Sequence, residues 1–217
     1  MKIFIVGANG AVGKKVIAQS LAIGHSVTAF VRNTKGLEEF KNLNIVKGSV
    51  ADDYEVLQSA ITGHDAVISA LGNHLWLKGR KSVPIMEKAF SNIVSAMHHH
   101  SIRKFATVIA WGTGASYEKS NLFVKLIVNT LIKSDFKDFT AAEKVLAESQ
   151  LDWTLGYFGA LTDDVSEHLP KISTELKMPK PASIPRGEIA RFLLHAVTND
   201  GLAQKRVALT QSGNNEK

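Results

Sequence analysis

The sequence has no cysteine, only five prolines and no long apolar run, and each of these shortages excludes a class of protein. Without cysteine, the 217 residues can form neither disulfide bonds nor thiolate metal sites, and no cysteine nucleophile is available. No stretch approaches the roughly 18 uncharged apolar residues of a transmembrane helix. Met1 and Lys2 lead directly into an apolar segment without a cleavage site, so no signal peptide is expected. These features predict a cytoplasmic protein with no membrane partner.

The chain also lacks a dense cluster of one charge, although its formal net charge is +6. The basic residues are scattered, and the densest group is Lys78, Arg80 and Lys81. Because neither a basic stripe nor an aromatic platform is present, we expect no nucleic-acid partner. An excess of positive charge is also typical of an enzyme for anionic ligands. The length and the 45% hydrophobic content predict a single domain over residues 1–217.

What the sequence does contain is a glycine-rich turn between an apolar run and a helical pattern. Residues 3–6 predict a buried strand, and Gly7, Gly10 and Gly13 follow at once. This strand–turn–helix unit is typical of sites for a dinucleotide pyrophosphate. Gly7 would allow a sharp exit from the strand, Gly10 a close approach of phosphate oxygens, and Gly13 close packing of the helix. The open amides at the helix start would then face the ligand.

Strands and helices alternate along the rest of the chain. Strands are predicted at 25–31, 45–46, 66–70, 105–110, 153–157 and 206–209, and helices at 37–43, 52–61, 84–98, 122–132, 136–149 and 186–197. This alternation predicts an α/β fold with a Rossmann-type, doubly wound parallel sheet. Residues 159–185 hold four of the prolines and predict an irregular excursion on the substrate side. The apolar segment 122–132 is either a buried helix, which we favour, or a dimer surface.

In such sheets the ligand lies outside the carboxyl ends of the strands, where the strand order reverses. We therefore expect the cofactor to contact the glycine turn and the strand ends. The predicted cofactor-binding residues are Gly7, Asn9, Gly10, Ala11, Val12, Gly13, Arg32, Asn33, Ser49, Val50, Ala70, Leu71, Gly72, Ile109, Ala110, Tyr157 and Phe158.

The end of the second predicted strand favours one dinucleotide over the other. An NAD site uses a carboxylate there to bind the ribose 2′-hydroxyl, but this strand ends in Val31-Arg32-Asn33. A planar guanidinium binds phosphate through two parallel hydrogen bonds. Arg32, with Asn33 or Lys35 beside it, therefore predicts NADP(H) as the cofactor. The alternative is that Arg32 is a solvated surface arginine.

Over nearly its whole length the chain resembles the atypical short-chain dehydrogenase/reductases, and most of all the NADPH-dependent flavin reductase and biliverdin-IX-beta reductase group. The matching segments are 7–13, 31–32, 63–68, 143–154, 158–163 and 184–190. The resemblance implies an NAD(P)-binding oxidoreductase. In the family, a Ser at the end of the fifth strand and a Tyr-x-x-x-Lys pair carry catalysis, but here Ala110, Asp135 and Phe139 occupy those positions. The catalytic residues are therefore unknown.

The missing acid predicts the kind of acceptor. Reduction of a simple carbonyl needs an acid to protonate the developing alkoxide. A flavin, quinone or bilin spreads the incoming charge over its own π-system and can take its proton from water. We expect such an acceptor in an apolar pocket lined by Trp111, Phe139, Phe158 and Trp76. The alternative is a non-catalytic NADP(H)-binding redox sensor.

Two further questions concern metals and assembly. Three consecutive histidines, residues 98–100, cannot converge on one ion from a helix, so we expect a solvated helix end and no metal. The sequence is compatible with a monomer or a homodimer.

Overall fold

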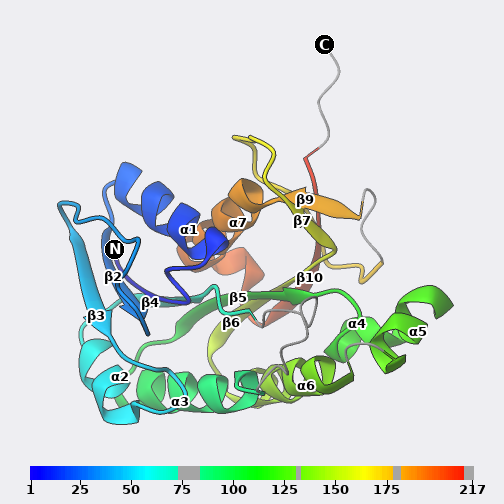
Figure 1. Cartoon of the computed structure of the whole chain (residues 1–217), viewed down its shortest axis with the longest axis horizontal. Helices are drawn as coiled ribbons and strands as arrows, with labels where there is room; N and C mark the ends of the chain where they lie inside the picture. Colours follow the sequence, from blue (N-terminus) through cyan, green and yellow to red (C-terminus); the bar gives the residue numbers. More distant parts are fainter. Residues whose placement is uncertain (73–83, 131–132, 178–181, 213–217) are drawn as a thin grey trace.

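A computed structural model describes residues 1–72, 84–130, 133–177 and 182–212, and an eight-stranded sheet runs through it (Figure 1). The strand order is β3-β2-β1-β4-β5-β6-β10-β8, and every pair is parallel except β10 with β8. The strands are β1 (Lys2–Val6), β2 (Ser26–Val31), β3 (Leu43–Lys47), β4 (Ala66–Ser69), β5 (Lys104–Ala110), β6 (Asp152–Phe158), β8 (Lys171–Ser173) and β10 (Lys205–Thr210). The order reverses between β1 and β4, which confirms the predicted Rossmann-type sheet.

Helices cover both faces of this sheet (Figure 1). One face carries α1 (Ala11–Ala22) and α7 (Arg186–Thr198), and the other carries α2 (Tyr54–Ala60), α3 (Met86–His99) and α6 (Lys133–Glu148). Of two shorter helices, α4 (Gly114–Glu118) lies against α6, and α5 (Leu122–Thr130) lies beyond the amino end of α6. None of the helices in the described ranges is long and apolar enough to cross a bilayer.

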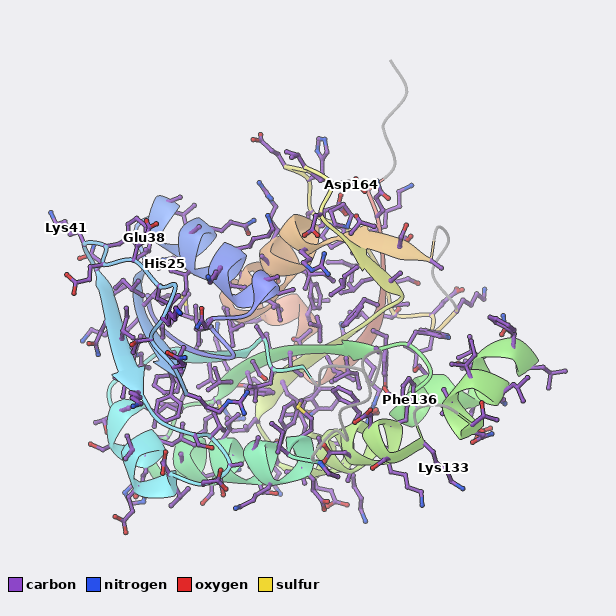
Figure 2. The ribbon with its side chains drawn as sticks, viewed as in Figure 1. His25, Glu38, Lys41, Lys133, Phe136 and Asp164 are labelled. Atoms are coloured by element: carbon purple, nitrogen blue, oxygen red, sulfur yellow. The ribbon has the colours of Figure 1, made fainter. Side chains whose placement is uncertain are left out.

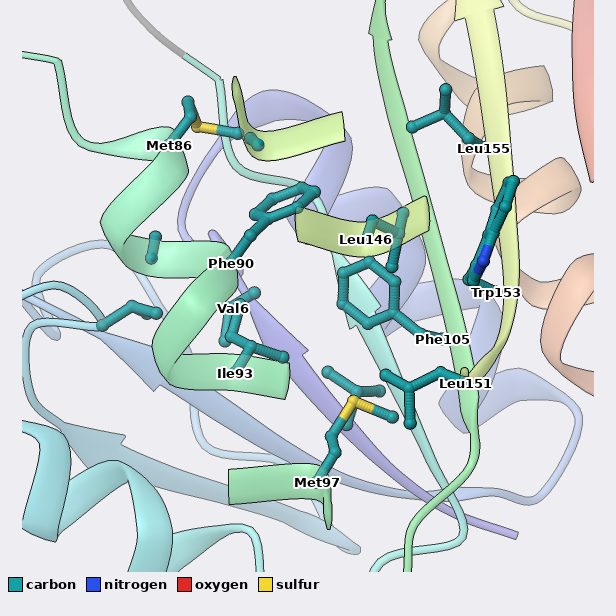
Figure 3. Close-up of a cluster of buried hydrophobic side chains, with 14 of the residues drawn as sticks. Val6, Met86, Phe90, Ile93, Met97, Phe105, Leu146, Leu151, Trp153 and Leu155 are labelled. Atoms are coloured by element: carbon teal, nitrogen blue, oxygen red, sulfur yellow. The ribbon is translucent and has the colours of Figure 1, made fainter. Parts of the chain in front are cut away.

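The core consists of two apolar clusters, one on each face of the sheet. Successive residues of a strand point to opposite faces, so Val6 of β1 packs in the cluster under α3 while Ile5 packs under α1 and α7. In the α3 cluster, the rings of Phe90 and Phe105 meet edge to face with their centroids 5.5 Å apart (Figure 3). Continuous apolar strands are therefore buried on both sides, as expected for a parallel sheet.

The helix predicted at residues 37–43 is wrong. The segment runs as an extended loop and a turn, and β3 begins at Leu43. Gly36 and Asn42 both have left-handed backbone conformations, with φ of 82° and 67°, which a right-handed helix cannot contain. The spacing of three apolar residues was misleading here, and Phe40 is more than half exposed.

The excursion at 159–185 is more regular than predicted. It contains β8 and two further short strands, β7 (Ala160–Thr162) and β9 (Ser183–Pro185), which form a separate parallel pair. The amide of Ala160 donates to the carbonyl oxygen of Ala182 at 2.6 Å. Local sequence could not predict this pairing, because its partners lie about two dozen residues apart.

The expectation that residues 122–132 form a buried helix is also wrong for the described part of that segment. Residues 122–130 are helical, as α5, but Leu122, Phe123 and Leu126 are 86%, 69% and 62% exposed. Only Val128 of this helix is buried. Apolar composition predicted the helix but could not show whether the rest of the chain covers it.

Candidate functional site

The glycine turn after β1 is too tightly packed for side chains. Gly7 has a φ of 72°, and a Cβ there would lie 2.6 Å from the carbonyl carbon of Ala70 at the end of β4. A Cβ on Gly13 would overlap the carbonyl oxygen of Gly7, which also accepts a hydrogen bond from the Gly10 amide at 3.0 Å. The turn therefore brings the start of α1 directly over the carboxyl ends of β1 and β4.

In the part of the chain that the structure describes, α1 lacks an acceptor for its first amides. Its N-cap is Gly10, which has no side chain to accept a hydrogen bond, and its first turn has no acidic residue. The amides of Ala11, Val12 and Gly13 find no acceptor within the described ranges. Three free donors at the positive end of a helix form a site for an anion. A pyrophosphate fits this arrangement, since its oxygens need donors and close backbone approach.

The loop after β2 is tied to the glycine turn by Asn9. Its Nδ2 donates to the carbonyl oxygens of Asn33 and Lys35, at 3.0 and 2.9 Å. The side-chain Oδ1 of Asn33 accepts from the Lys35 amide at 2.9 Å, which closes the loop on itself. Two predicted cofactor-binding residues, Asn9 and Asn33, thus use their side chains to shape the site.

Three cations surround that loop. Arg32 and Lys35 are exposed within it, and the Nζ of Lys14 lies 3.3 Å from the position that a Cβ on Gly36 would take. Neither Lys14 nor Lys35 forms an ion pair with any residue that the structure describes. The sequence analysis did not include Lys14 among the candidate cofactor contacts. Its place directly after the third glycine, on the exposed side of the first helical turn, could have indicated it.

The loop after β3 completes this side of the site. Ser49 donates its amide to Asp53 and its hydroxyl to Asp52, at 2.7 and 2.8 Å. The hydrogen bond from Ser49, then Lys88, and to a smaller extent the charge of Arg32 hold the pKa of Asp52 below its usual value. The loops after β1, β2 and β3 therefore meet around Arg32. Val50 is buried behind them.

On the side of the glycine turn away from β2 and β3, the site is bordered by the carboxyl ends of β4, β5 and β6. We call these strand ends the floor of the site. Ala70, Leu71, Ala110 and Phe158 are half-buried there, Gly72 is exposed, and Ile109 is buried. The Trp111 amide donates to the carbonyl oxygen of Phe158 at 2.7 Å and joins the ends of β5 and β6. Partly exposed apolar residues at these strand ends are suited to hold a flat ring system.

Tyr157 points into the apolar cluster under α3 and α6, so its side chain is not exposed at this floor, where a cofactor contact was expected. Its ring is fully buried, and its hydroxyl donates to Glu143 at 2.8 Å. Glu143 also accepts from Arg206 Nε at 2.6 Å and from the Ala115 amide at 3.3 Å. Burial and the negative charge of Glu143 raise the pKa of the Tyr157 phenol. These hydrogen bonds to Glu143 attach the end of β6 to α6.

The structure does not bring the predicted aromatic pocket together. Trp111 and Phe139 are each 5% exposed and belong to the core under α3 and α6, whereas Phe158 packs against the opposite cluster. The Trp111 ring instead meets Tyr157 edge-on, with centroids 6.0 Å apart. Trp76 lies outside the described residues. Trp111 and Phe158 do lie at the ends of β5 and β6, as predicted. Their side chains, however, point to opposite faces of the sheet.

The positions of the family's catalytic set offer no acid to the floor. Ala110 has no ionisable group, Phe139 has none either, and Asp135 is buried within α6. No group of three histidine or carboxylate side chains that could hold a metal occurs in the ranges that the structure describes. Of the consecutive histidines, His98 and His100 hydrogen-bond to the carbonyl oxygens of Ser149 and Gln58.

Comparisons with known proteins agree with this geometry. A family model described as NAD(P)H-binding matches residues 7–200. The photosystem II assembly factor Ycf39 of Synechocystis sp. is 26% identical over 94% of this chain, which spans only 61% of that protein. A short-chain dehydrogenase/reductase of Veillonella parvula in complex with NADP shares the fold, with a TM-score of 0.79, 19% identity and coverage of 99% and 96% of the two chains. The anaerobillin reductase ChuY of Escherichia coli O157:H7 also shares the fold, with a TM-score of 0.75, 18% identity and coverage of 100% of each chain.

Proposed function

This chain belongs to the NAD(P)H-binding family, and from that premise we propose that it is an NADPH-dependent reductase of a flavin, quinone or bilin-like acceptor. The observation that carries the proposal is the uncapped amino end of α1, where three amides have no acceptor among the described residues and three cations stand nearby. These amides would hold the pyrophosphate of the cofactor. The bound nicotinamide would supply the hydride.

The preference for NADP(H) over NAD(H) rests on the cations around the loop after β2. That strand ends without a carboxylate for a ribose 2′-hydroxyl, and Arg32 stands in its place. Lys14 approaches the same loop from α1, and Asn9 holds the loop in position. We propose that Arg32 and Lys14 together bind the 2′-phosphate, the first through paired hydrogen bonds and the second as a point charge.

The acceptor class follows from the groups around the floor. Because Ala110 and Phe139 cannot donate a proton and Asp135 is buried, an isolated ketone would receive no help with its developing alkoxide. A conjugated acceptor needs orientation and exclusion of water, which half-buried Leu71, Ala110 and Phe158 can provide. The fold shared with a protein described as an anaerobillin reductase supports this class.

The turnover experiment follows NADPH absorbance with FMN, riboflavin, a benzoquinone and a linear tetrapyrrole as separate acceptors. We expect oxidation of NADPH with at least one of them and none with simple ketones. Reduction of ketones at a comparable rate would show that an acid acts in the site and would overturn the assignment of the acceptor class.

The cofactor experiment compares the affinities for NADPH and NADH in Arg32→Ala, Lys14→Ala and the neighbouring Lys15→Ala. Loss of one charge-assisted contact of about 1.5–3 kcal/mol should reduce the preference for NADPH by roughly ten- to a hundredfold in Arg32→Ala, and by less in Lys14→Ala. Lys15 is also exposed on the same helix but forms no hydrogen bond or ion pair with the described residues of the loop, so its variant serves as the control. If the ratio of NADPH to NADH affinity is the same in all three variants, neither Arg32 nor Lys14 is the source of the preference for NADPH.

A second candidate is a redox sensor that binds NADP(H) without turnover. The replaced catalytic positions, Ala110, Asp135 and Phe139, favour it, since they leave the cofactor site intact and remove the acid. Tight binding of NADPH with no oxidation by any of the four acceptors would favour the sensor over the reductase.

A further inference from the structure

α5 presents an apolar face that no described residue covers. Leu122, Phe123 and Leu126 are 86%, 69% and 62% exposed, and their spacing places them on one side of the helix. The opposite side is anchored, because Val124 and Val128 pack over Gly112. The helix, which lies at the edge of the molecule (Figure 1), is therefore held on the protein with three large apolar side chains exposed.

The charges around this face are mainly positive, with one exposed acidic residue, Glu118, directly before it. From Lys119 to Ser134 the sequence has three lysines, residues 119, 125 and 133, and no acidic residue. Lys133 stands at the beginning of α6, next to α5 (Figure 2). The first acidic residues of α6, Asp135 and Asp138, are buried and do not offset these charges at the surface. The face is therefore both apolar and cationic.

A second copy of the chain fits this face poorly. A standard protein interface uses about 20–30 residues from each partner, whereas this patch consists of three large side chains on one nine-residue helix. A two-fold dimer would also bring the lysines of both copies into one interface, and residues 119–134 contain no acidic residue to offset them. Both arguments count against a homodimer through α5.

An anionic lipid surface fits the exposed apolar side chains, the flanking lysines and the small size of the patch. An amphipathic helix binds such a surface by burying a few apolar side chains at the level of the head groups, and flanking lysines are attracted to anionic lipids. We propose that α5 docks the protein reversibly on an anionic membrane surface, with Leu122, Phe123 and Leu126 inserted and the three lysines against the head groups. This goes beyond the proposed reductase function and does not depend on it. It also departs from the sequence-based expectation of no membrane partner.

Co-flotation of the full chain with lipid vesicles tests the proposal. Vesicles of phosphatidylcholine alone are compared with vesicles that also contain phosphatidylglycerol, at low and at high salt. We expect binding to the anionic vesicles and its loss at high salt, where charges are screened. The double variant Phe123→Ser/Leu126→Ser should weaken the partition about tenfold or more, since two apolar side chains no longer insert. Replacing Lys119 and Lys125 by Gln should weaken it by roughly fivefold for each lysine.

The matched control is Ile23→Ser, because Ile23 is 62% exposed, as is Leu126, but follows α1. Its binding to vesicles should equal that of the wild type. Because the changed side chains are exposed, thermal melts should show that all variants fold. Absence of binding to either vesicle, or equal loss in the Ile23 control, would overturn the proposal. A dimer in light scattering that the Phe123/Leu126 variant dissociates would assign the face to a second copy instead.

Discussion

The amino ends of α1 and α3 lie on opposite faces of the same sheet and are treated in opposite ways. At α3, the amides of Ile85, Met86 and Glu87 donate to the carboxylate of Asp138 at 2.8, 2.9 and 3.0 Å. At α1, the amides of Ala11, Val12 and Gly13 in the first turn have no acceptor among the described residues, and the nearby charges are cations. At α3 the carboxylate of Asp138 is the anion that accepts from the first amides. At α1 no described residue takes that role, which leaves the amides available to the anion of a ligand.

α6 provides this anion twice. Asp138 serves the start of α3, and one turn further along, Glu143 accepts from the Ala115 amide in α4 and from Tyr157 and Arg206. Both carboxylates are buried, and both join α6 to a neighbouring element. Among the described residues, the start of α1 receives no such carboxylate, so the amino ends of α1 and α3 differ in this respect.

The largest expected effect comes from filling the space on which the open site depends. Gly13→Ala places a Cβ against the carbonyl oxygen of Gly7 and must push α1 away from the sheet. We expect NADPH affinity to fall about a hundredfold or more, measured by isothermal titration. Gly24→Ala is the control: its Cβ enters open space, and because Gly24 has a left-handed φ of 82° the change should cost about 1 kcal/mol of stability without loss of binding.

Making α1 resemble α3 should reduce binding while it stabilises the free protein. Gly10 has φ and ψ of −72° and 164°, which suit an N-cap with a side chain, although a Cβ there would lie 3.2 Å from the Gly7 carbonyl oxygen and offset part of the gain. Gly10→Asp should raise the free energy of unfolding by a few tenths of a kcal/mol. It should also weaken NADPH binding roughly thirtyfold, because the carboxylate both occupies the amides and repels phosphate.

Gly10→Asn separates these two causes, since the amide side chain caps the helix without a charge. Its affinity for NADPH should lie between those of the wild type and Gly10→Asp. If the two variants bind NADPH as tightly as the wild type, the α1 start is not the phosphate site.

Removing the anion at α3 should affect stability and leave binding unchanged. Asp138→Ala leaves three buried or half-buried amides of α3 without their acceptor, and we expect a loss of about 1–3 kcal/mol in the free energy of unfolding. Urea denaturation measures this loss, and Asp138→Asn should show a smaller one. A fall in NADPH affinity larger than threefold would contradict the separation of the two helix starts.

The smallest effect concerns pH at the Glu143 network. The raised pKa keeps the Tyr157 phenol protonated in the folded chain at pH values where an unfolded tyrosine, with a pKa of about 10, ionises. The stabilisation by this group is therefore complete below about pH 10 and decreases above it, by at most about 1.4 kcal/mol per pH unit. Urea denaturation from pH 8 to 11 should show this slope in the wild type and a shallower one in Tyr157→Phe. Equal slopes would show that Tyr157 is not the group that titrates.

Local patterns were sufficient to predict much of the fold and the centre of the site. The glycine spacing identified the turn because Gly7 and Gly13 each lack room for a Cβ, a requirement that shows directly in sequence. The apolar strands were recognisable because both sheet faces are covered. Arg32 could be proposed as a cofactor contact because its position is set by the end of one strand.

Features that depend on distant partners could not be predicted in this way. Asp138 reaches α3 across 52 positions of the chain, and Lys14 approaches Gly36 only because of how the loop after β2 folds. Tyr157 was placed at the correct strand end, but the face toward which its ring points depends on the register of β6 in the sheet. For α5, apolar side chains look the same in sequence whether the fold covers them or not.

Calorimetric titration of the wild-type protein with NADPH and, separately, with NADH tests the central claim most directly. An open α1 start flanked by Arg32 and Lys14 predicts one NADPH bound per chain, with NADH at least about tenfold weaker. No heat of binding from either dinucleotide, or equal affinity for both, would contradict the account.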